Sequence, residues 1–208
     1  MKSLRPSSEG GRSSYDLTIP PVVRFGHGRI AEVGHVATVL GKRIWLVVGK
    51  RSFFTCGGRE SLLDGFRQNG LSFEEIAHSH GEPTVQQVAN AICNMPGDQK
   101  NVVVVAVGGG ATIDFGKALS ALATNIKPDS EEIAEEMIVD RLEGVGRGVP
   151  IVNPPLPFLA VPTTAGTGAE ATRNAVLSCS KRRFKKSLRS PLMVPRAVIL
   201  DPSLIGSC

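Results

Sequence analysis

Apolar and polar residues along the chain alternate between runs typical of buried strands and spacings typical of helices. Residues 102–107 (VVVVAV) form an unbroken, mostly β-branched apolar run that ends at the three glycines of 108–110. Apolar residues then recur with the helical spacing i, i+3, i+4 and i+7: Phe115, Ala118, Leu119 and Leu122. A strand that is apolar on both faces belongs inside a parallel sheet covered by helices. This stretch therefore predicts a strand, a glycine turn and a helix, which is half of a βαβ unit.

The same alternation continues through the first two-thirds of the chain. The pattern predicts further strands and helices between turn signals. The expected strands are 43–48, 71–76, 158–161, 174–178 and 197–200, and the expected helices are 30–40, 60–68, 85–92 and 131–142. Residues 15–25 are extended and contain two prolines, which indicates an edge strand or two short strands. Together these elements predict an α/β fold with a Rossmann-like, doubly wound and mainly parallel sheet.

Composition narrows the class of protein. The chain has 208 residues, of which 41% are hydrophobic and 21% charged, so we expect a globular domain over 16–208 behind a flexible tail over 1–15. Four cysteines lack zinc spacing and are expected to be reduced, and no metal site is expected. No apolar run approaches the roughly 20 residues of a membrane helix, and no secretory leader is present. We therefore expect a cytoplasmic protein without a membrane partner.

The net charge of +5 is moderate, and much of it lies in 181–189 (KRRFKKSLR). This run could be a solvated basic face, or it could attract ligands that carry phosphate. A nucleic-acid partner is not expected, because no recognisable nucleic-acid-binding module accompanies the basic residues.

The glycine turn is the first candidate site. Gly108, Gly109 and Gly110 would lie at the carboxyl edge of the sheet, where such folds bind ligands. Without side chains they let a phosphate approach the backbone, and the helix start behind them offers N–H groups and the positive end of a dipole. Asp114 and Lys117 are i, i+3 neighbours on that helix. They could line the floor of a cleft for a nucleotide, or they could form a surface ion pair.

Two further strand ends carry candidate chemistry. Thr163, Thr164 and Thr167 place three hydroxyls beside glycines after strand 158–161, where they could bond phosphate, ribose or a nicotinamide carboxamide. An ordinary hydroxyl-capped helix start is the alternative. Gly49 ends strand 43–48 and precedes two cations, at a position where a carboxylate would bind a ribose 2′-hydroxyl and repel a 2′-phosphate. This favours NADP, unless the loop is only a solvated basic turn.

Two of these stretches resemble motifs of the iron-containing (group III) alcohol dehydrogenases. Residues 108–117 (GGGATIDFGK) resemble the motif GGGS-x-x-D-x-x-K, and residues 162–172 (PTTAGTGAEAT) resemble PTTAGTGSEVT. The resemblance extends over about 17–204 and includes the segments 81–84 and 190–202. Ala111 and Ala169 stand where the motifs have serine, so one hydroxyl is lost in each loop.

The resemblance implies a cofactor, a reaction and a domain organisation. Members of the family interconvert alcohols and aldehydes or ketones with NAD(P). They join an α/β nucleotide-binding domain to a C-terminal helical domain that holds iron or zinc with an Asp and three His. By resemblance, Gly108, Gly109 and Gly110 would hold the pyrophosphate, Thr163 and Thr164 would lie near the nucleotide, and Asp114 and Lys117 match the polar pair of the motif. Gly49 falls where many NAD-preferring members carry Asp, which again favours NADP.

The chain stops where the family's helical domain would begin, which sets the expectations for activity. The metal, the alcohol or carbonyl substrate and the catalytic residues are therefore expected only in the full-length family. This chain is expected to be the cofactor-binding part, inactive alone and able to associate as a homodimer. Two alternatives stay open. One is a non-catalytic nucleotide-binding remnant. The other is the glycerol dehydrogenase or dehydroquinate synthase-like branch, although the PTTAGTG stretch favours the alcohol dehydrogenase branch over it.

Overall fold

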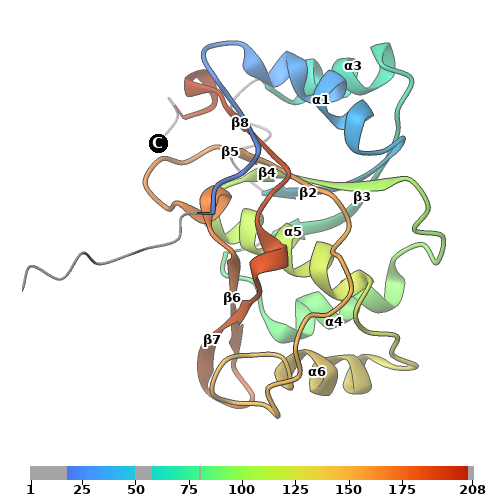
Figure 1. Ribbon diagram of the computed structural model, residues 1–208, viewed down its shortest axis with the longest axis vertical. Helices are drawn as coiled ribbons and strands as arrows, with labels where there is room; N and C mark the ends of the chain where they lie inside the picture. Colours follow the sequence, from blue (N-terminus) through green and yellow to red (C-terminus); the bar gives the residue numbers. More distant parts are fainter. Residues whose placement is uncertain (1–17, 50–57, 80, 206–208) are drawn as a thin grey trace, which may run out of the picture.

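The computed structural model describes residues 18–49, 58–79 and 81–205, and its centre is a six-stranded sheet (Figure 1). The strand order is β1-β8-β5-β4-β2-β3, and every neighbouring pair is parallel. The strands are β1 (Val22–Phe25), β2 (Arg43–Gly49), β3 (Ser72–Ser79), β4 (Val102–Gly108), β5 (Phe158–Pro162) and β8 (Ala197–Leu200). The sheet confirms the predicted Rossmann-like α/β fold. The expected tail over 1–15 lies outside the described residues.

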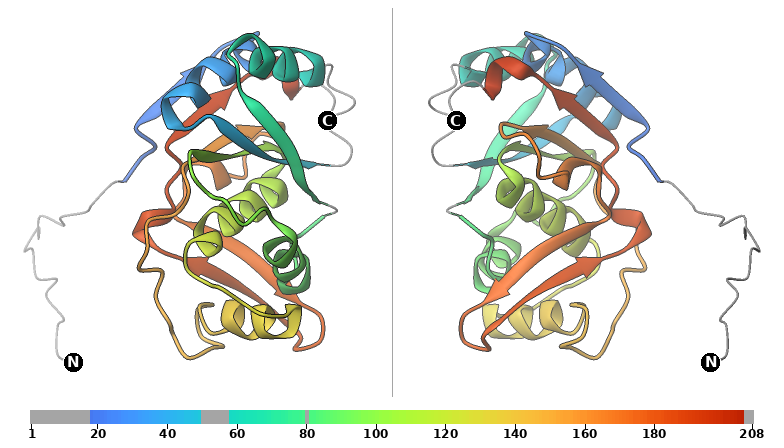
Figure 2. Two further views of the ribbon diagram at one scale, coloured as in Figure 1. Left: turned by 90° about the vertical axis from the view of Figure 1, so that its right-hand side faces the viewer. Right: turned by 90° about the vertical axis from the view of Figure 1, so that its left-hand side faces the viewer.

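Helices cover both faces of this sheet (Figure 2). One face packs against the 3-10 helix η1 (Arg29–Glu32), α1 (Val33–Leu40) and α3 (Gly58–Gln68), and the other against α4 (Val85–Asn94) and α5 (Gly110–Ala123). Strand β4 shows why: Val103, Val105 and Val107 point into the first core, while the alternate residues at 102, 104 and 106 point into the second. Side chains of a strand alternate between faces, so a continuous apolar run requires a core on each side.

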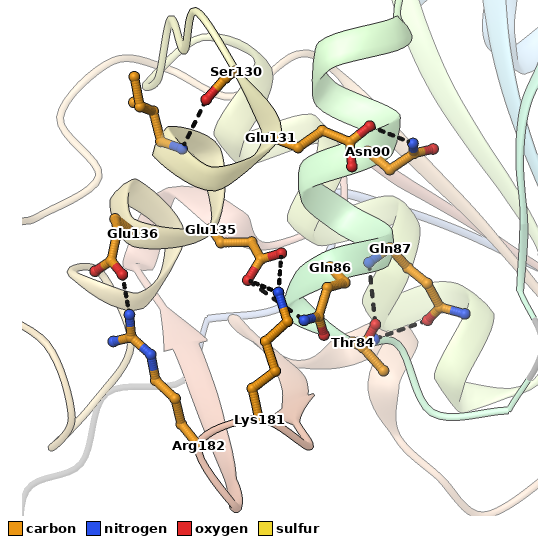
Figure 3. Close-up of polar contacts among 11 residues, drawn as sticks. Thr84, Gln86, Gln87, Asn90, Ser130, Glu131, Glu135, Glu136, Lys181 and Arg182 are labelled. Atoms are coloured by element: carbon orange, nitrogen blue, oxygen red, sulfur yellow. Dashed lines mark hydrogen bonds and ion pairs between the residues drawn. The ribbon is translucent and has the colours of Figure 1, made fainter.

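Local hydrogen bonds fix where two of the helices begin (Figure 3). Thr84 and Gln87 form a capping box in which each side chain bonds the other residue's backbone N–H, and α4 starts there. Ser130 accepts from the N–H of Ile133 and starts α6 (Glu131–Val139), which is shorter than the predicted 131–142. No helix in the described ranges is both long and apolar enough to cross a bilayer.

The basic run forms a strand that the hydrophobic pattern did not predict. Strand β6 (Asn174–Cys179) pairs antiparallel with β7 (Phe184–Arg189), and this hairpin packs beside α5 rather than joining the main sheet. At the turn, Lys181 bonds Glu135 and Arg182 bonds Glu136 of α6 (Figure 3). These cations thus face carboxylates of their own chain. Such exposed ion pairs contribute little to stability individually.

Candidate functional site

The strand order brings the three candidate loops to one edge of the sheet. Strand β3 lies on one side of β2, whereas β4, β5 and β8 follow one another on the other side. The direction in which successive strands are added therefore reverses between β2 and β4. Open α/β sheets bind ligands at the carboxyl ends of the strands beside such a reversal. Val48 pairs with Val107, and Gly108 pairs with Pro162. The buried Gly49 therefore ends β2 beside the glycine turn, whereas residues 50 and 51 lie outside the described residues.

The glycine turn is packed closely against two threonines at Gly108 and Gly110. A Cβ at Gly108 would lie 2.4 Å from Thr112 Oγ1, and a Cβ at Gly110 would lie 2.9 Å from the Cβ of Thr167. Gly109 is the N-cap of α5, and within the described residues no side chain caps this helix. The first N–H groups of a helix have no partner inside the helix. The turn therefore offers backbone donors to an anion.

The threonine loop, which we define as residues 163–168, faces this turn from the end of β5. The N–H of Thr163 donates to Gly108 O at 2.9 Å, and the Thr163 side chain is fully buried. The buried hydroxyls of Thr163 and Thr164 have no hydrogen-bond partner in the described part of the chain. Buried hydroxyl groups are normally satisfied, because leaving one unpaired costs about 1–3 kcal/mol. Two buried hydroxyls without a partner therefore lie in the loop that meets the glycine turn.

The alternative interpretation of the threonine loop, a hydroxyl-capped helix start, applies only to one short 3-10 helix. Gly166 and Gly168 take left-handed φ values of 92° and 66°, which glycine adopts without strain. After them comes only a short 3-10 helix, η2 (Ala169–Ala171), and then strand β6. Thr167 is exposed, and its hydroxyl lies 3.4 Å from the N–H of Ala169.

Asp114 and Lys117 lie on the side of α5 that meets the segment after the threonine loop. Lys117 Nζ, which has three hydrogens to donate, lies within hydrogen-bonding distance of four oxygens: Ala169 O at 2.5 Å, Thr172 O at 2.9 Å, Thr172 Oγ1 at 3.2 Å and Asn174 O at 2.9 Å. Asp114 Oδ2 accepts from the N–H of Val176 at 3.1 Å. Lys117 is only 1% exposed, and no ion pair of the described residues joins it to Asp114. The surface ion pair considered from the sequence is therefore not what the two residues form.

Burial dominates the titration of both groups. It lowers the pKa of Lys117 to about 8, against the opposing effect of the negative charges of Asp114 and Glu170. Burial likewise raises the pKa of Asp114 above the usual carboxylate range, although the hydrogen bond from Val176 and the charge of Lys117 act against it. Both groups thus have their charged forms disfavoured by desolvation.

Two further charged residues near this site were missed from the sequence. The charges of Glu82 and Lys185 also act on the pKa of Asp114, and Lys185 Nζ lies 2.7 Å from Glu82 Oε2. They are 103 positions apart, and Lys185 comes here only because β7 pairs with β6, which packs beside α5. No sequence spacing signals such a pair.

The described residues do not supply a metal site. No three His, Cys, Asp or Glu side chains among them gather in a way that could hold a metal ion. The residues described here therefore do not fit the iron or zinc of the resembling family.

Comparison with known proteins gives a consistent result. The sequence model of iron-containing alcohol dehydrogenase matches residues 20–202. A choline dehydrogenase of Bacillus subtilis is 28% identical, covering 97% of this chain and 48% of that protein. The NADH-dependent butanol dehydrogenase A of Thermotoga maritima superposes with a TM-score of 0.79 at 25% identity, over 93% of this chain and 46% of that one.

A further solved structure contains a cofactor. The sulfoacetaldehyde reductase of Bifidobacterium kashiwanohense, in complex with NAD+, superposes with a TM-score of 0.76 at 28% identity, over 94% of this chain and 48% of that one. The chain spans about half the length of the proteins that it matches.

Proposed function

The chain belongs to the iron-containing alcohol dehydrogenase family, and from this premise we propose that it provides the dinucleotide-binding part of an NAD(P)-dependent interconversion of alcohols and aldehydes or ketones. The observation that carries the proposal is the pair of unsatisfied hydroxyls, Thr163 and Thr164, in the loop that meets the glycine turn. In such a reaction the nicotinamide carries the hydride, and the protein binds and orients it.

The proposed cofactor lies across the reversal point of the sheet. Its pyrophosphate accepts hydrogen bonds from the backbone at Gly108, Gly109 and Gly110, where the dipole of α5 favours negative charge. The hydroxyls of Thr163, Thr164 and Thr167 supply the second wall. Support for this arrangement comes from the two loops meeting side by side, because a Cβ at Gly109 would lie 3.4 Å from the Thr164 side chain.

The preference for NADP is part of the proposal. It rests on Gly49, which ends β2 without the carboxylate that would repel a 2′-phosphate. Of the proteins compared above, the butanol dehydrogenase is NADH-dependent, and the sulfoacetaldehyde reductase is in complex with NAD+. Parallel titrations with NADPH and NADH test the preference, and tighter binding of NADH would overturn it.

Binding is measured through the single tryptophan, Trp45, which is buried in β2. Its emission overlaps the absorption of reduced nicotinamide, so bound NADPH quenches it by energy transfer. We expect saturable quenching, weakened about three- to tenfold by Thr164→Val, because one hydrogen bond is worth about 0.5–1.5 kcal/mol. Thr38→Val is the matched control, because the Thr38 hydroxyl bonds His35 O on the opposite face of the sheet. Absence of saturable binding at millimolar NADPH would refute the proposal.

Turnover is a separate question. Since the described residues bring no metal ligands together, we propose that this chain by itself binds cofactor without oxidising alcohols. The same observation favours the second candidate, a nucleotide-binding remnant with no reaction of its own. Purified chain is mixed with NADP, a small alcohol and added iron or zinc. Appearance of NADPH would exclude both the hypothesis that the chain alone is inactive and the hypothesis that it is a remnant without a reaction.

A homodimer is the last part of the proposal. Edge strand β1 exposes Val23 and Phe25, which are 51% and 70% accessible. Exposed apolar side chains on an unpaired sheet edge favour association. Sedimentation velocity tests this, and a monomer at all concentrations would contradict it.

A further inference from the structure

We propose that Lys117 is a positioning residue: it holds the threonine loop in its cofactor-binding position from behind and makes cofactor affinity fall in alkali. This inference rests on the proposed function, since it concerns how the same site is kept ready. It differs from the sequence expectation, because Lys117 would act through the loop and not by touching the dinucleotide.

The loop has few other attachments. In the described part of the chain, the only backbone hydrogen bond outside strand pairing that joins residues 163–172 to another element is the one from Thr163 to Gly108. The bond from Ala171 N–H to Gly168 O lies within the segment itself. The four bonds from Lys117 Nζ begin at Ala169, directly after the last loop residue. The loop is thus fixed at its start by the sheet and at its end by Lys117.

Burial and the neighbouring charges act on the ammonium in opposite directions. Four acceptors and the carboxylates of Asp114 and Glu170 all favour the charged form, yet burial still disfavours it overall. The charges of Glu82 and Lys185 act on the pKa of Asp114, which in turn acts on the pKa of Lys117. A buried cation whose charged form is disfavoured lowers the stability of the fold. Its remaining physical consequence is geometric, because one nitrogen collects the carbonyls of Ala169, Thr172 and Asn174 onto one point.

Deprotonation would weaken this attachment. An ammonium group has three hydrogens to donate, whereas the neutral amine has two and turns a lone pair toward the carbonyl oxygens. Hydrogen bonds to charged groups are also stronger than neutral ones. The loop is therefore expected to loosen as the pH rises through the pKa of Lys117. The threonine hydroxyls would then spend less time opposite the glycine turn.

The test is a pH series of NADPH titrations with the full chain, from about pH 7 upward, where the 2′-phosphate (pKa about 6) has already ionised. The wild type should bind with constant affinity up to about pH 7.5 and lose up to about tenfold by about pH 9.5. Lys117→Met should bind about tenfold more weakly at neutral pH, with a flat profile. Lys181→Met is the matched control, because it removes one exposed cation that bonds only Glu135; it should follow the wild type.

Thr172→Val keeps the lysine but removes one of its acceptors, so the midpoint of the pH profile should move to lower pH. This variant decides the matter if Lys117→Met fails to fold. Equal affinity and an equal pH profile in wild type and Lys117→Met would overturn the inference, as would an unmoved midpoint in Thr172→Val. Both results would leave the proposed function intact. Absence of NADPH binding by the wild type would instead overturn the proposed function.

Discussion

The buried lysine makes a quantitative prediction about stability that is independent of any ligand. The pKa of Lys117 is lowered from 10.5 to about 8 in the folded chain. At pH values between these two pKa values the unfolded state binds more protons than the folded state, so the free energy of unfolding rises with pH. One pKa unit corresponds to about 1.4 kcal/mol, so this group alone adds about 1.4 kcal/mol from about pH 7 to about pH 9 and about 3 kcal/mol in total.

The assay is urea unfolding of wild type and Lys117→Met, followed by far-ultraviolet circular dichroism at the two pH values. The unfolding free energy of the wild type minus that of Lys117→Met should be about 1.4 kcal/mol larger at about pH 9 than at about pH 7. Other titrating groups are shared by both proteins and cancel. Lys181→Met should show no such change, because that side chain is 65% exposed. A difference that stays constant or shrinks with pH would show that burial does not govern the titration of Lys117.

Two other predictions concern single contacts. Gly110→Ala should reduce NADPH affinity at least about tenfold in the quenching titration, because its Cβ would lie 2.9 Å from that of Thr167 and displace the loop; unchanged affinity would mean that the loop yields freely. Asp201→Asn should lower the unfolding free energy by about 1–3 kcal/mol, because the buried carboxylate accepts from the N–H groups of Gly28 and Ile30. Although burial acts to raise it, these bonds hold the pKa of Asp201 below its ordinary value. The wild type should therefore lose its advantage over the variant as the pH falls below the ordinary aspartate pKa, and an advantage that persists in acid would contradict this.

Local patterns were sufficient for most of the sheet and for the glycine turn. The apolar run at 102–107 and the helical spacing after it predict β4 and α5 because each depends on neighbours within a few residues. Strand β7 escaped prediction because cations occupy half of its positions and only Phe184 and Leu188 are apolar. Its place is decided by pairing with β6, which the pattern of β7 alone does not reveal.

The candidate site was predicted only in part, for a related reason. Helical spacing places Asp114 and Lys117 on one face of α5, but it cannot say which distant segment that face meets. The partners of Lys117 lie 52 to 57 positions further along the chain. Contacts of this kind depend on how the loop folds back over the helix.

The pairing of β1 with β8 has a consequence for how the chain folds during its synthesis on the ribosome. Val22 lies beside Ala197, so β1 has its neighbour in the sheet far along the chain, after all the other strands of that sheet. Strands β2, β3, β4 and β5 can assemble while the chain is still growing, because their partners have already emerged. The segment 22–25 must wait until β8 has been made, and such distant pairing slows folding. During that wait an apolar strand is open to other proteins, and a chaperone that binds nascent chains would find it there.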